Sequence, residues 1–150
     1  MNSVHFAIYL EKCARERGGH LNMTMVQKLL YICYGLWLAI ECAQLFEERP
    51  KAWKYGPVFP KVHKKQMKFN DSLKKLERKI SHESFEKYDE LIDVVLNSFG
   101  AWSASQLVSW TIREGSAWHM KYVVLEEPYG TMDNLDIINE FETLIPSHKN

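Results

Sequence analysis

An apolar run near the start of the chain constrains the fold more than any other feature of the sequence. From Leu29 to Ala43, apolar side chains would cover nearly all sides of a helix. Such a helix is either a membrane span or the centre of a protein core. Because Lys28 and Glu41 bracket a run shorter than the ~20 residues that a bilayer requires, we predict a core helix and no membrane partner. We expect four of its side chains to be largely buried: Leu29, Leu36, Trp37 and Ile40.

Helical spacing of apolar residues also recurs through most of the rest of the chain. A length of 150 residues suits one domain, and 46% hydrophobic with 25% charged residues is typical of a folded globular protein. We therefore predict a single domain over residues 1–150. Its fold class is mainly α: a compact bundle of about six helices around the central apolar helix, with a minor β element near residues 45–57.

Capping and turn residues predict where the other elements begin. Three predicted helices have an N-cap residue, Ser3, Ser84 or Asp133, and Thr24 opens the central helix. Ser103 and Gln106 form a capping box, and Pro60 suits the first turn of a helix that reaches about Phe69. We expect Lys51–Tyr55 to be extended and paired with Leu45–Phe46. Residues 117–124 fit a helix or a strand equally well.

The charges cancel in total but are unevenly distributed. Residues 1–79 hold 15 of the 19 lysines and arginines and 7 of the 19 acidic residues, whereas residues 80–150 hold 4 and 12. A neutral total argues against a dedicated nucleic-acid-binding protein. The strongest local cluster lies on one face of a predicted helix: Lys61, Lys64, Lys65 and Lys68. This face is either a solvated helix surface or a docking site for an acidic partner.

Motifs for catalysis, cofactors or metals are missing from the sequence. The six histidines form no HExxH pair, and the chain contains no GxGxxG, GxxxxGK[ST] or GxSxG. We predict no catalytic residue, no metal and no cofactor. Two alternatives stay open: an enzyme with a dispersed, motif-free active site, and a regulatory nucleic-acid-binding phage protein. Three cysteines without CxxC spacing, and the lack of a signal-peptide pattern, predict reduced thiols in the cytoplasm.

The segment Trp53-Lys54-Tyr55-Gly56-Pro57 combines aromatic residues, a cation and a turn. Its aromatic residues either pack in the core or form the rim of an interface. Alternation along an extended segment places Trp53 and Tyr55 on one face and Lys54 on the other. We expect Trp53 to point inward, Tyr55 to be at least partly buried and Lys54 to be exposed. We predict that Lys54 and Tyr55 contact a partner.

Three segments in this order are similar to a known family. They are Gln27–Tyr31 continued by Tyr34, Gly35, Leu38 and Ala39, then Ala52–Val58, then Leu107–Trp118. Together they resemble the Panacea domain, also called SocA-like, over about Leu21 to Tyr122. The resemblance marks six positions as structural motif residues: Lys28, Trp53, Gly56, Pro57, Thr111 and Trp118. Ile112 stands where the family usually has histidine, and Ala117 where proline often precedes the tryptophan.

The resemblance implies an antitoxin of a bacterial or prophage toxin–antitoxin system. Members of this family neutralise a cognate protein toxin by direct binding, and some resemble adaptors that hand the toxin to a protease. The residues themselves predict a helical module with candidate anchor side chains and no catalytic motif, which is compatible with that function.

Overall fold

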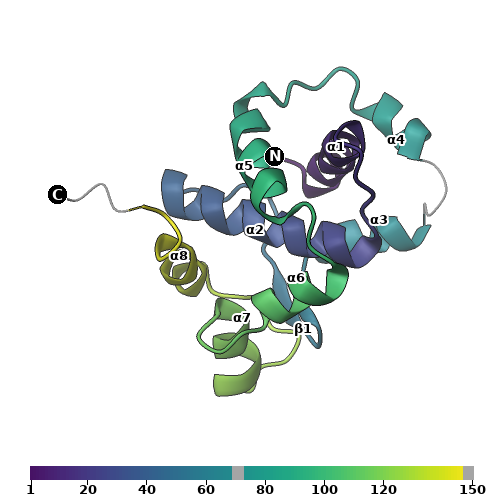
Figure 1. The fold of residues 1–150 in the computed structure, drawn as a ribbon. Coiled ribbons are helices and arrows are strands. Elements are labelled where there is room, and N and C mark those ends of the chain that lie inside the picture. The colour runs from purple at the N-terminus through teal and green to yellow at the C-terminus, as the bar shows by residue number, and fades with distance from the viewer. Residues whose placement is uncertain (69–72, 147–150) are drawn as a thin grey trace.

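Helix α2 (Met23–Glu41) crosses the middle of the molecule, and the other elements pack around it (Figure 1). The computed structural model describes residues 1–68 and 73–146. For residues 68 and 73–75 it describes the backbone but not the side chains. On one side of α2 lie α1 (Ser3–Glu16), α4 (Leu73–Lys79) and α5 (Asp89–Phe99); on the other lie strand β1 (Lys51–Trp53), α6 (Ala104–Thr111) and α7 (Ala117–His119). The remaining elements are β2 (Gly56–Val58), α3 (Pro60–Lys68), the 3-10 helix η1 (Glu86–Tyr88), the π-helix η2 (Met120–Val124) and α8 (Asn134–Glu142).

The mainly α fold around a central apolar helix is confirmed, with eight α-helices in the described part of the chain where about six were predicted. Leu29 is fully buried, as expected. Leu36 and Trp37 are only half-buried, and the prediction for Ile40 is wrong because its side chain is 58% exposed. In the ribbon view the last turn of α2 extends beyond α5 (Figure 1).

Helix α2 is longer than the apolar run that predicted it. It has 19 residues with a mean hydropathy of 1.4, so its length and composition are sufficient to cross a membrane. Within this protein 61% of that stretch is buried, as in the core helix of a globular domain. The length argument against a span is therefore wrong, and the absence of a membrane partner stays a prediction.

Three of the predicted helix starts are displaced by a few residues. Asn2 caps α1 in place of Ser3, and Asn22 caps α2 in place of Thr24, because each asparagine side chain accepts the backbone N–H three residues on. Ser84 does not occupy the N-cap of α5, because η1 intervenes and Tyr88 takes that position. The capping box of Ser103 and the Asp133 cap of α8 are confirmed.

The β element is a hairpin with a different pairing from the one predicted. Strand β1 pairs antiparallel with β2, so that Lys51 lies opposite Val58. Leu45 and Phe46, the predicted partners, are buried in the core instead. The other edge of β1 is covered by the segment after η2, where the Ala52 amide donates to the Gly130 carbonyl at 2.9 Å. Each edge of β1 is thus paired, which fixes the strand in place.

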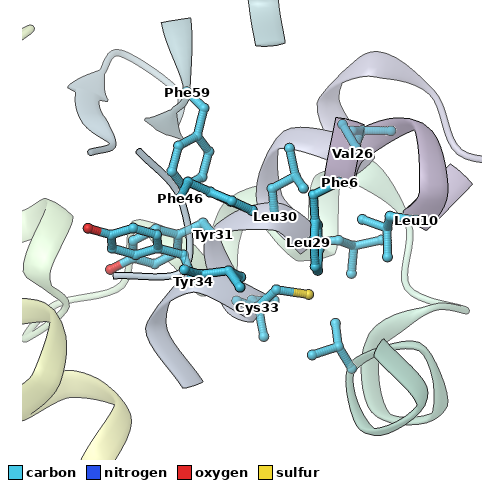
Figure 2. Packing of buried hydrophobic residues seen from close by; sticks show 14 of the residues in the cluster. Phe6, Leu10, Val26, Leu29, Leu30, Tyr31, Cys33, Tyr34, Phe46 and Phe59 are labelled. Atoms are coloured by element: carbon cyan, nitrogen blue, oxygen red, sulfur yellow. The ribbon is translucent and has the colours of Figure 1, made fainter. Parts of the chain in front are cut away.

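Aromatic rings fill the core around the middle of α2. Figure 2 shows Tyr31 and Tyr34 extending from α2 in one direction, with Phe46 and Phe59 nearby. The rings of Phe46 and Phe59 pack edge to face with centroids 5.2 Å apart. On the side of α8, the Phe141 ring lies against Gly35 so closely that a Cβ at position 35 would overlap it. This glycine therefore allows α8 to approach α2.

Replacing Gly35 with alanine tests this contact. In an open helix the change stabilises by up to about 1 kcal/mol, because alanine has the higher helix propensity. Here the new methyl group overpacks the α2–α8 contact, so we expect Gly35→Ala to lower the free energy of unfolding by about 1–3 kcal/mol. Urea denaturation measures it. Adding Phe141→Leu should recover part of the loss, whereas a stabilised single variant would contradict the packing described.

Candidate functional site

The first turns of α2 hold the hairpin through two buried polar side chains. The Gln27 side chain accepts the Phe59 amide at 2.8 Å and donates to the Phe59 carbonyl at 3.3 Å. The Lys28 ammonium donates to the Pro57 carbonyl at 3.0 Å. Both side chains are buried, so these hydrogen bonds replace the ones that the backbone groups of Pro57 and Phe59 would otherwise make with water. They fix β2 against α2.

Gly56 lies where this anchor meets α6. Its φ is +118°, a conformation that favours glycine. A Cβ there would lie 2.8 Å from the Thr111 hydroxyl oxygen and 3.0 Å from Cε of Lys28. The Trp118 indole donates to the Trp53 carbonyl at 2.7 Å, which joins α7 to the same hairpin. The structure thus brings together all six motif residues, from three segments far apart in sequence.

The Lys28 amine is an unusual group for a protein interior. Only 3% of the residue is exposed, and burial lowers its pKa from 10.5 to about 8. Desolvation disfavours the charged form, and a single carbonyl compensates it only in part. The amine thus lies at the base of the hairpin, bonded to its backbone, and a structural role for Lys28 stays a prediction.

The tip of the hairpin is directed into solvent. Trp53 is half-buried, with its ring 5.0 Å from the His63 ring and 6.2 Å from the Tyr129 ring, centroid to centroid. Lys54 is exposed as predicted, and its ammonium lies 5.4 Å from the Tyr55 ring centroid. The expected burial of Tyr55 is wrong, since 65% of it is exposed. Tyr55 belongs to the tight turn, so the alternation of an extended strand does not reach it.

An exposed apolar run lies on η2 and the residue after it. Helix η2 contacts β1, and the Tyr122 ring stacks on the Trp118 ring at 4.7 Å. Val123, Val124 and Leu125 are 47%, 56% and 49% exposed. We define the hairpin surface as the following residues: Trp53, Lys54, Tyr55, Val123, Val124, Leu125 and Tyr129. The sequence alone did not identify Val123, Val124 and Leu125 as exposed. Residues 117–124 fitted a helix or a strand, and neither assignment showed which side faces solvent.

The predicted lysine face lies on α3. Lys61, Lys64 and Lys65 are exposed, and the side chain of Lys68 lies outside the described residues. The Lys61 ammonium is 3.9 Å from the Glu47 carboxylate, so part of its charge is compensated within the chain. Lys65 lines a separate groove next to α1. The contribution of these lysines to partner binding stays a prediction.

A buried carboxylate that sequence reasoning missed links α2, α7 and α8. Glu140 accepts the Tyr31 hydroxyl at 2.7 Å, the Ala117 amide at 3.1 Å and the Arg113 guanidinium at 2.8 Å. Both carboxylate oxygens are engaged, so the network joins helices and offers no free base. No group of three or more histidine, cysteine or acidic side chains with metal-binding geometry occurs in residues 1–68 and 73–146.

Comparison with known families gives a match that covers more than half of the chain. The model of the family described as "Antitoxin SocA-like, Panacea domain" matches residues 26–119. This stretch includes most of α2, the hairpin, α6 and α7, which carry all six motif residues. Neither a curated protein nor a solved structure matches the chain.

The buried amine gives a testable pH dependence. Because the pKa of Lys28 is lower in the folded chain than in the unfolded one, folding favours the neutral amine. Lys28 therefore contributes more to the free energy of unfolding as the pH rises from about 8 to 10.5. Relative to Lys28→Met, the wild type should gain on the order of 2–3 kcal/mol across this range.

Denaturation of both proteins at several pH values measures the difference, and other titrating groups cancel in the comparison. A parallel NMR titration of the Lys28 Cε signal should have its midpoint near pH 8. A midpoint at the ordinary value of 10.5 would contradict the burial of this amine.

Proposed function

The chain belongs to the SocA-like antitoxin family with a Panacea domain, and from this membership we propose that it neutralises a protein toxin by binding it directly. The proposed pair is bacterial or prophage-encoded and acts in the cytoplasm. The observation that supports a binding role most directly is the hairpin surface, where large apolar and aromatic side chains are exposed on and next to two segments, β1 and η2, that contact each other. Exposed apolar clusters mark interaction sites on soluble proteins.

The hairpin surface has the chemistry of an interface centre. Tyr55 and Tyr129 offer large amphipathic rings, and Lys54 adds a cation at the edge of the cluster. Its backbone is rigid, because α2, α7 and the segment after η2 each hydrogen-bond to the hairpin. Binding to a preformed surface loses less conformational entropy than ordering a loop. We therefore infer that the toxin contacts this surface.

The proposed activity requires no catalytic group. Neutralisation follows if the bound chain covers a surface that the toxin needs. Delivery of the toxin to a protease is a second route, and the two differ in a measurable way. Coverage alone leaves the level of toxin unchanged, whereas delivery shortens its half-life in cells that contain the protease.

We expect substitutions at the hairpin surface to weaken binding without unfolding the chain. Co-expression with the open reading frame adjacent to its gene should rescue growth and co-purify the two proteins. Val124→Ser and Tyr55→Ser should each raise the Kd about tenfold or more, and Lys54→Ala should raise it less. The free energy of unfolding should change by only about 0.5 kcal/mol for each exposed site.

Val94 provides the matched control. It is 50% exposed on α5, on the other side of α2, against 56% for Val124. Val94→Ser should bind and neutralise like the wild type. If Val124→Ser and Tyr55→Ser also bind like the wild type, the toxin contacts another face. If the wild type neither rescues growth nor binds the toxin, the antitoxin proposal is wrong.

A further inference from the structure

A second surface, separate from the hairpin, is hollowed enough to hold side chains of a partner. A groove of about 560 Å³ lies between α1, the start of α2, α3 and α4. Most of its wall is apolar, from the following residues: Val4, Ala7, Ile8, Leu21, Met23, Val62 and Leu76. A groove of this kind suits the apolar side of an amphipathic segment.

One acidic side chain, Glu11 of α1, interrupts the apolar wall. The pKa of this carboxyl is raised from 4.5 to about 7, because the effect of burial exceeds the lowering by Arg15, and Glu77 adds to the rise. Arg15 is itself paired with Glu77, so its charge is shared between two carboxylates. A carboxylate in an apolar wall is stabilised when a cation comes close, because the opposite charge offsets its lost hydration.

Other charged or titratable groups also face the groove. His20, in the turn before α2, and Lys65, on α3, line it, and Glu77 on α4 is close enough to act on the charge of Glu11. Lys65 makes interactions of its own, and the side chains of residues 68 and 73–75 are outside the described part of the chain. Of the charged side chains that line the groove in the described part of the chain, Glu11 is acidic and Lys65 is basic. Glu11 is the one set in the apolar wall, so this point of the wall favours a cation.

We propose that the groove binds an amphipathic segment of the toxin, whose apolar side chains fill it and whose lysine or arginine pairs with Glu11. The inference rests on the proposed antitoxin function and adds a second contact with a defined chemistry. Paired with a cation, Glu11 is ionised in the complex. The complex therefore becomes tighter as the pH rises through the range in which free Glu11 loses its proton.

The test compares binding of the purified toxin at pH 6 and pH 8. With a carboxyl that titrates near pH 7, affinity of the wild type should be about tenfold higher at pH 8. Glu11→Gln should remove this dependence and bind at pH 8 about as weakly as the wild type does at pH 6. Glu16→Gln, an exposed site on the same helix, should behave like the wild type.

Further variants separate Glu11 from other titrating groups. The pH dependence of the affinity should persist in His20→Gln. Groups of the toxin that titrate in this range would change the affinity of every variant by the same factor, so they cancel when variants are compared. Glu11→Lys should bind poorly, and reversal of one basic toxin residue to glutamate should restore that binding. An unchanged pH dependence in Glu11→Gln overturns the groove proposal and leaves the antitoxin function intact. Failure of the wild type to bind the toxin at either pH contradicts the antitoxin function itself.

Discussion

The contact between the start of α2 and the hairpin is the interaction on which the rest of the structure depends. Gln27 and Lys28 are buried polar residues at the start of an otherwise apolar helix, and both bond to the backbone around β2. Buried polar groups are costly unless they are satisfied, so each fixes the position of its partner closely. These bonds favour the observed register of the strand against α2, because another register would leave the buried groups without their partners.

This contact also links the core to the surface proposed to bind the toxin. A tight turn at residues 54–55 joins β1 to β2, and β1 is also bonded to Trp118 and to the backbone of Tyr129 and Gly130. The exposed side chains of the hairpin surface thus project from a backbone that is bonded on several sides. A rigid base of this kind favours selective binding, because little freedom is lost when the partner docks.

The sequence predicted the features that depend on local pattern. Apolar spacing placed α2, and the capping box at Ser103 placed α6, because both signals lie within a few residues. The exposure of Ile40 and Tyr55 depends on where neighbouring elements end, which no local pattern contains. The motif positions were identified by resemblance, but their convergence and the Glu140 network come from tertiary contacts. The exposed Val123–Leu125 run was missed for the same reason.

The central claim is that the toxin covers the hairpin surface, and hydrogen–deuterium exchange of the complex tests it most directly. Backbone amides of residues 53–55 and 123–129 should exchange more slowly when the toxin is bound. Amides of α5, on the other side of α2, should exchange at the same rate in both states. Protection of α5 with no change at residues 53–55 and 123–129 would contradict the account.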